Sequence, residues 1–170
     1  MIVDYAELMY KNVVWHSYEI YYKDFEKALE DFNEKLVEAG LTVKGPLFYS
    51  LNNIPLDEIM QVDIHMHVEQ AYVPKDVDLN FQSYLYIDQM IMTRVKDDFE
   101  TNTEFAYDKL LKYAMENEFK IVSPIYHIMR GDDEMQWVEL KAKIYSEMDF
   151  YEDLEEETEY WDGVLASFGK

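Results

Sequence analysis

The spacing of apolar and polar residues divides the chain into alternating strand-like and helix-like segments. Residues 13–22 are rich in β-branched and aromatic side chains, which is typical of a strand. In residues 23–40, apolar positions recur with the spacing of an amphipathic helix, and they are Phe25, Ala28, Leu29, Phe32 and Leu36. Residues 41–51 and 60–69 predict two further strands, separated by a turn at 52–55. The pattern therefore predicts the order strand, helix, strand, strand, with the helix near residues 24–39.

The strand at residues 60–69 alternates strictly between apolar and polar side chains, so its two faces have different environments. We expect the apolar set to face the helix, and it comprises Val62, Ile64, Met66 and Val68. The polar set, Asp63, His65, His67 and Glu69, then points the other way. Two of these side chains could share a metal ion with a third ligand from another strand. A solvated strand face explains the pattern more simply, and we predict no metal and no cofactor.

The same order of elements recurs in the second half of the chain. Strands are predicted at 84–95, 119–129 and 137–144, a turn at 130–133 and a helix near 102–117. Thr101 and Glu104 have the spacing of a capping box at the start of that helix. A shift of 78 positions places Pro46 on Pro124 and Ala28 on Ala106. We predict an α+β fold of tandem β-α-β-β units, residues 13–69 and 84–144, related by pseudo-twofold symmetry and forming one domain at 13–146, after a lead-in at 1–12.

This repeat resembles the GyrI-like small-molecule-binding family, which includes the effector-binding domains of AraC-type and MerR-type transcription regulators and a stand-alone gyrase inhibitor. The resemblance covers residues 13–145 and is carried by the proline-containing segments 44–49 and 122–127, each between a helix and a hairpin. It implies an antiparallel sheet with two helices on one face and an open groove on the other. With no DNA-binding segment attached, we expect a stand-alone domain.

Members of that family bind hydrophobic, often cationic, ligands, and many carry a Glu three residues beyond the second proline. Here that position is His127, and its counterpart in the first half is Tyr49. Because a neutral imidazole lacks the fixed charge that holds a cation, the preference for cations does not carry over. We predict that a small, largely apolar ligand binds in the groove between the two repeats, through Tyr49, His127, Trp137, Glu139, His65 and His67.

Catalysis by this groove is a weaker interpretation. Some relatives of the fold hydrolyse reactive small molecules with paired carboxylates and a tyrosine, and the nearest equivalents here are Glu139, Asp63 and Tyr49. Acidic residues number 36 among 170, so some face any groove by chance. The sequence also lacks cysteine and a glycine-rich phosphate loop. We predict a binding protein with no catalytic residues.

The charge balance limits the possible partners and locations. With 36 acidic and 15 basic residues the formal net charge is −21, which disfavours direct contact with nucleic acid. There is no apolar run long enough for a membrane span and no basic, apolar signal peptide. The absence of cysteine fits a reducing compartment, so we expect a cytoplasmic protein.

Residues 147–170 differ most from the GyrI-like pattern. Nine acids lie between 147 and 162, and an apolar stripe at helical spacing runs through Tyr151, Leu154, Thr158, Trp161, Leu165 and Phe168. This predicts an acidic amphipathic helix whose stripe packs on the protein itself or docks a partner through Trp161, Leu165 and Phe168. The alternative function is therefore a protein-interaction module or inhibitor that binds a basic protein or a second copy of the chain through its acidic surface.

Overall fold

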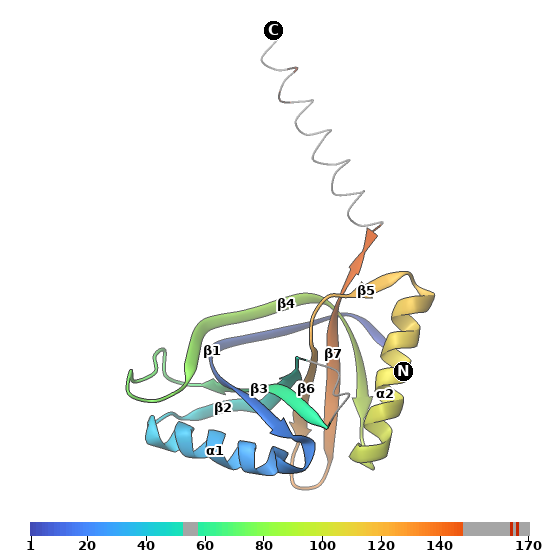
Figure 1. The fold of residues 1–170 in the computed structure, drawn as a ribbon. Helices are drawn as coiled ribbons and strands as arrows, with labels where there is room; N and C mark the ends of the chain where they lie inside the picture. Colours follow the sequence, from blue (N-terminus) through green and yellow to red (C-terminus); the bar gives the residue numbers. More distant parts are fainter. Residues whose placement is uncertain (53–57, 148–163, 165, 167–170) are drawn as a thin grey trace.

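The computed structural model describes residues 1–52, 58–147, 164 and 166, and it has an antiparallel sheet with two helices (Figure 1). The elements of the first half are β1 (Val3–Tyr21), a short 3-10 turn η1 (Tyr22–Asp24), α1 (Phe25–Glu38), β2 (Val43–Leu51) and β3 (Ile59–Val68). Those of the second half are β4 (Asn80–Val95), α2 (Phe99–Glu116), β5 (Phe119–Ile121), β6 (Ile125–Gly131) and β7 (Gln136–Ser146). The α+β class agrees with the prediction, and so does the order of elements apart from one additional strand after α2.

Three boundaries differ from the sequence prediction. The lead-in at 1–12 belongs to β1, because Val3, Ala6 and Leu8 pair with β4. Likewise β4 begins at Asn80, inside the segment expected to be a connector. The strand predicted at 119–129 is two strands, since the chain leaves the sheet at residues 122–124, where Pro124 has no N–H to donate to a neighbouring strand. The predicted turn at 52–55 lies largely outside the described residues.

The sheet closes on itself, which the prediction of an open groove face did not anticipate. The strand order is β4-β1-β3-β2-β6-β7-β5, and β4 also pairs with β7 over Val95↔Val138 to Met90↔Lys143. Six strands therefore form a ring, and β5 extends it beside the end of β7. The face opposite the helices is the inside of this ring.

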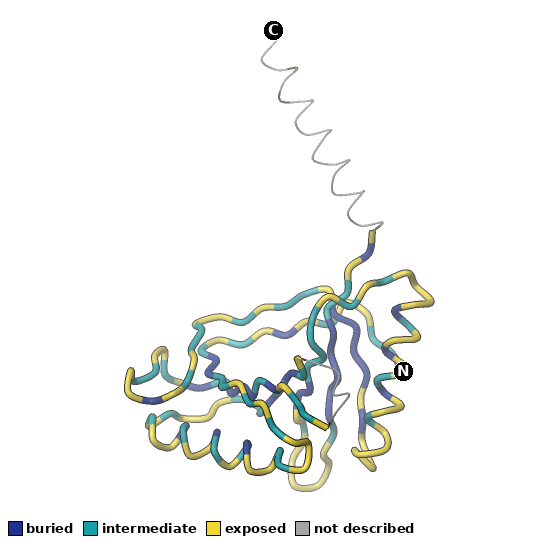
Figure 2. The backbone as a smooth tube through the Cα atoms, viewed as in Figure 1, coloured by how far each residue is buried: buried dark blue, intermediate teal, exposed yellow. Residues whose placement is uncertain are grey.

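Both helices pack on the outside of the ring, each over the strands of its own half. The predicted stripe of α1 is confirmed, because Ala28, Phe32 and Leu36 are buried with the apolar residues of β3. On α2, the equivalent buried residues are Ala106, Leu110 and Ala114, and they lie against β4 and β7. In the tube drawing, buried residues concentrate on the strands, and each helix is exposed along its outer side (Figure 2).

A third apolar cluster fills the interior of the ring. Its fully buried members come from four strands, and they are Leu8, Val13, Phe48, Met90 and Ile128. Because these side chains occupy the space that an open groove would need, the inner face is a packed core. Each half begins with a strand, a helix and then further strands, two in the first half and three in the second. Their superposition as pseudo-symmetric repeats stays a prediction.

Candidate functional site

A cleft lies on the outside of the ring, where the first turns of both helices approach β2 and β6. It has a volume of about 460 Å³. Its lining combines aromatic, aliphatic and a few polar side chains, and it consists of Tyr22, Phe25, Tyr49, Leu51, Met60, Phe99, Glu100, Thr103, Tyr107, His127, Met129 and Val138. Concave, mostly apolar cavities of this size are typical of small-molecule sites.

The floor of the cleft is built from aromatic rings supplied by both halves of the chain. Tyr49 and His127 are directly opposite each other on β2 and β6, and their rings stack with centroids 4.3 Å apart and planes 9° apart. Phe25, at the start of α1, contacts Tyr49 at 4.8 Å between centroids. From α2, Tyr107 meets the imidazole edge-on, at 5.6 Å and 89°. The floor is therefore an aromatic surface formed by both halves of the chain.

His127 is the least exposed polar residue of the cleft, with 1% of its surface accessible. Burial lowers the pKa of His127 from 6.5 to about 4, so the imidazole is neutral near pH 7. Its Nε2 atom is hydrogen-bonded with the Tyr107 hydroxyl. Its Nδ1 atom is buried and has no hydrogen-bond partner among the described residues.

The two tyrosines of the floor also remain uncharged. Burial raises the pKa of Tyr49 to about 12, and burial together with the neighbouring Tyr49 raises that of Tyr107. Among the described residues that line the cleft there is no lysine or arginine, and the single acid, Glu100, is exposed on the first turn of α2. The cleft therefore offers neutral hydroxyl groups in its depth and a carboxylate only at its edge.

The prediction that Tyr49 and His127 share a face with Trp137, Glu139, His65 and His67 is wrong. Tyr49 is paired with Ile64, and His127 with Leu140, so both point to the helix side. The other four belong to the opposite face, on the inside of the ring. Apolar and polar residues do not alternate here, because Phe48 and Tyr49 are both aromatic, and a register irregularity separates Val43 from Leu47. Ligand binding by these six residues stays a prediction.

Sequence reasoning missed Tyr107 and Thr103, which reach the cleft from α2. They are four residues apart and so lie on one helix face, which was a usable signal. Their hydroxyl groups made them indistinguishable from the solvated side of an amphipathic helix. Phe99 and Met129 were missed because they lie at the ends of elements, where periodicity is lost.

Inside the ring, His65 and His67 are part of an aromatic stack. The His65 ring lies parallel to Phe48, with centroids 4.7 Å apart, and is also stacked on Trp15 at 6.3 Å. Burial lowers the pKa of His65 from 6.5 to about 4, against the opposing effect of Asp63. The Nδ1 atom of His67 contacts the backbone oxygen of Lys11, next to the positive-φ residue Asn12. Both histidines therefore have structural contacts.

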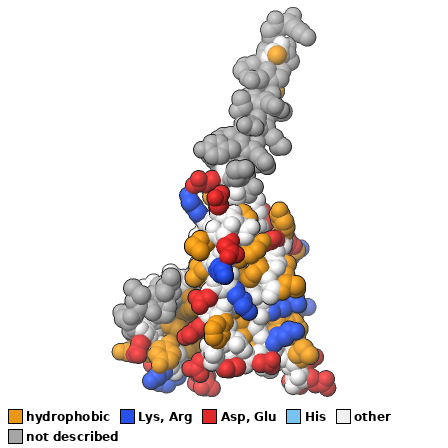
Figure 3. Space-filling view, turned by 90° about the vertical axis from the view of Figure 1, so that its right-hand side faces the viewer, with side chains coloured by type: hydrophobic (Ala, Val, Ile, Leu, Met, Phe, Trp, Pro, Cys, Tyr) orange, Lys and Arg blue, Asp and Glu red, His pale blue; other side chains and the backbone are white. Residues whose placement is uncertain are grey.

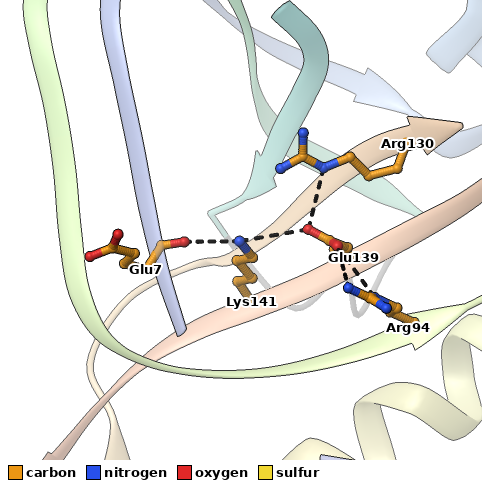
Figure 4. A network of polar contacts seen from close by, with 5 residues as sticks. All are labelled: Glu7, Arg94, Arg130, Glu139 and Lys141. Atoms are coloured by element: carbon orange, nitrogen blue, oxygen red, sulfur yellow. Dashed lines mark hydrogen bonds and ion pairs between the residues drawn. The ribbon is translucent and has the colours of Figure 1, made fainter. Parts of the chain in front are cut away.

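Glu139 lies at the centre of a buried ion cluster in the same interior (Figure 4). Its carboxylate is 3.2 Å from Nη2 of Arg94, 3.3 Å from Nε of Arg130 and 3.6 Å from Nζ of Lys141. Lys141 also donates to the backbone oxygen of Glu7, at 2.9 Å. Burial alone would raise the pKa of Glu139, but Lys141 and Arg130 outweigh it and lower the pKa below its usual value. The Glu139 carboxylate is thus paired with three cations and is buried away from solvent, so it is not available to bind a ligand as an acid.

A family model described as a domain of unknown function, DUF5085, matches residues 9–146. The chain belongs to the DUF5085 family. The matched segment includes both helices and nearly the whole ring, so the aromatic cleft and the ion cluster lie within the DUF5085 domain. No curated protein matches the sequence significantly.

Solved structures with a similar fold include two that contain EcmrR. A chain in the cryo-EM structure of the EcmrR–DNA complex in EcmrR-RPo has a TM-score of 0.66 and 14% identity over 84% of this DUF5085 chain and 58% of that chain. The crystal structure of the EcmrR C-terminal domain has a TM-score of 0.63 and 12% identity, covering 84% of this chain and 98% of that domain. The DUF5085 chain thus spans little more than half of the first of these. At this identity the likeness establishes the fold.

The remaining predictions fall on other parts of the DUF5085 chain. Among the described residues, no three His, Cys, Asp or Glu side chains are grouped as metal ligands, and no helix is long and apolar enough to cross a membrane. On the face that carries α2, acidic, basic and hydrophobic side chains are interspersed (Figure 3). The predicted acidic helix at 147–170, with Trp161, Leu165 and Phe168, lies almost entirely outside the described residues.

Proposed function

We propose that this chain binds a small, uncharged and largely apolar molecule in the cleft between its two helices, as a sensor or sequestering protein. The observation that carries the proposal is the stacked floor of Tyr49 and His127 beneath a cavity of about 460 Å³. A buried aromatic surface contributes binding free energy through the apolar area that it removes from water. The GyrI-like resemblance and the shared fold with the EcmrR C-terminal domain support the same function.

The neutral floor favours an uncharged ligand over a cation. A charged group that enters the cleft loses water and finds no opposite charge in its depth, which costs several kcal/mol in an apolar environment. The exposed Glu100 at the rim remains hydrated and compensates little of this cost. The proposal therefore departs from the cationic preference implied by the resemblance.

Replacing Tyr49 with Ala is expected to weaken binding by about 1–3 kcal/mol, the usual effect of losing one buried aromatic contact. A thermal-shift screen of uncharged aromatic compounds would identify a ligand, and calorimetry would give its affinity for each variant. Tyr86→Ala is the matched control, because Tyr86 is an exposed tyrosine on β4 and is absent from the cleft.

The position of Trp137 allows the ring interior to be tested as an alternative site. Trp137 is on the inner face of β7, whereas Tyr49 faces the cleft. If Trp137→Ala abolished binding while Tyr49→Ala left it unchanged, the ligand would occupy the inner side of the sheet, and the proposed cleft would be wrong.

A further inference from the structure

A second cavity, of about 290 Å³, opens beside the aromatic cleft at the turn between β6 and β7. β4 pairs with β7 only as far as Val95↔Val138, and the chain then turns away toward α2. Over residues 136–137, the described strands therefore leave β7 with β6 as its only neighbour. The second cavity is lined by this end of β7, by the β6–β7 turn and by Phe99, the first residue of α2.

The second cavity adjoins the cleft. Phe99, Met129 and Val138 line both spaces. Val138 is buried, but Phe99 and Met129 are 38% and 44% exposed, and an unbranched methionine side chain adapts readily to its neighbours. A ligand that is longer than the cleft can therefore extend past these two side chains without displacing the packed core.

The two spaces differ in polarity. In the cleft, Glu100 is the only charged side chain among the described lining residues. The second cavity is smaller but is lined by four charged or amide side chains, which are Arg130, Asp132, Asp133 and Gln136. Because burial of a polar group without a hydrogen-bond partner is costly, the cleft favours the apolar part of a ligand and the second cavity favours a polar end.

Two of these four polar side chains already have partners. Nε of Arg130 is 3.3 Å from the Glu139 carboxylate, and the carboxylate of Asp132 accepts two backbone N–H groups of the turn, at 2.9 and 3.0 Å. Asp133 and Gln136 are exposed, and their side chains have no hydrogen-bond or ion-pair partner among the residues that the structure describes. A carboxylate and an amide oxygen both accept hydrogen bonds, so a ligand hydroxyl group can donate to either. A ligand carboxylate would instead be repelled by Asp132 and Asp133.

We infer that the ligand is an elongated amphipathic molecule, whose apolar body lies on the Tyr49–His127 floor and whose neutral, hydrogen-bond-donating end reaches the second cavity. This inference rests on the proposed function and adds the shape and the polar end of the ligand. Asp133 and Gln136 accept the polar end, and the ligand passes over Phe99 and Met129 to reach them.

Four ethers of 2-naphthol test this inference, by titration of the naphthyl fluorescence with the full chain at neutral pH. Two carry a six-methylene linker that ends in a hydroxyl group or in a methyl ether, and two carry the same ends on a two-methylene linker. Only the hydroxyl ends donate a hydrogen bond. The wild-type protein is expected to bind the long alcohol about 3- to 10-fold more tightly than the long methyl ether, the effect of one neutral hydrogen bond. The short pair stays within the cleft and should show no such advantage.

A double variant with Asp133→Ala and Gln136→Ala removes the two acceptors of the second cavity. The two long probes should then bind equally, while the affinity for 2-methoxynaphthalene, which is too short to leave the cleft, stays unchanged. Glu134→Ala is the matched control, because Glu134 lies on the same exposed turn but lines neither space. It should keep the wild-type ratio of affinities.

Several results would overturn the inference and leave the proposed function intact, as long as 2-methoxynaphthalene binds. These are equal wild-type affinities for the long pair, an equal hydroxyl advantage in the short pair, or an advantage that persists in the double variant. Equally tight binding of a six-methylene probe that ends in a carboxylate would contradict the selection of a neutral end. If no naphthalene probe bound the wild-type protein, the inference and the proposed function would both be overturned.

Discussion

Replacing Glu139 with Gln should reduce the free energy of unfolding by about 3–5 kcal/mol, the usual cost of removing one partner from a buried ion pair. The carboxylate is 6% exposed and is the shared counter-charge of Arg94, Arg130 and Lys141. Without it, three positive charges would face one another inside the ring. Lys141 would be affected most, because its side chain is only 10% exposed, whereas that of Arg94 is 52% exposed and can turn to water.

Urea unfolding at neutral pH measures this loss, and Glu134→Gln provides the matched control. Glu134 is exposed on the β6–β7 turn, and its substitution changes the net charge by the same amount. It should alter stability by less than about 0.5 kcal/mol. Adding Lys141→Met to Glu139→Gln should restore part of the lost stability, because it removes the most deeply buried of the three cations that have lost their shared counter-charge. A loss below about 1 kcal/mol for Glu139→Gln alone would show that water reaches the cluster.

The parts of the fold that the sequence predicted correctly are those with a local periodic signal. The stripe at Ala28, Phe32 and Leu36 and the alternation from Val62 to Val68 each specify one buried face, and both faces meet in a single cluster. Such patterns depend only on the repeat of a helix or a strand, so one sequence is sufficient to detect them.

Features that depend on contacts between distant segments could not be predicted in this way. Ring closure requires β4 to pair with β7, about 45 residues away in sequence, and no local pattern encodes that pairing. The lead-in was ambiguous because register irregularities between Val3 and Leu8, around the positive-φ residue Tyr5, interrupt the regular pairing of β1. The direction of Tyr49 was undetermined for the same kind of reason, since its neighbour Phe48 is equally apolar and is buried on the other face.

The composition of the candidate site depends on which face of the sheet Tyr49 and His127 point to. Tyr49 and His127 were identified from their positions after the two prolines, and they do lie together. Their four predicted companions are on the other side of the sheet, and the cleft is completed by side chains from the first turns of the helices. The types of Tyr49 and His127 indicated an aromatic site, but the face of the sheet to which they point is determined by the pairing register of β2 and β6.

Lowering the pH from 7 to 4 should destabilise the protein through its two buried neutral histidines. Burial lowers the pKa of both His65 and His127 from 6.5 to about 4. In the unfolded chain each ring takes up a proton as the pH falls through about 6.5, but in the folded protein it does so only near pH 4. Stability therefore declines across the window from about 6.5 to 4 and loses no more from these groups below it. One pKa unit corresponds to about 1.4 kcal/mol, so each histidine accounts for about 3 kcal/mol over the window.

Unfolding by urea at several pH values between 7 and 4 tests this, with His65→Gln and His127→Gln measured beside the wild type. Each variant is expected to be less stable at pH 7, because glutamine does not reproduce the ring stacking, but to lose about 3 kcal/mol less than the wild type by pH 4. Comparison at each pH cancels the titration of the acidic residues, which all variants share. Phe48→Leu is the control for reduced stability alone, since it weakens the same ring interior without removing a titrating group and should keep the wild-type pH dependence. If both histidine variants declined as steeply as the wild type, the imidazoles would be accessible to protons in the folded state. The neutral floor of the cleft, on which the proposed preference for an uncharged ligand depends, would then be refuted.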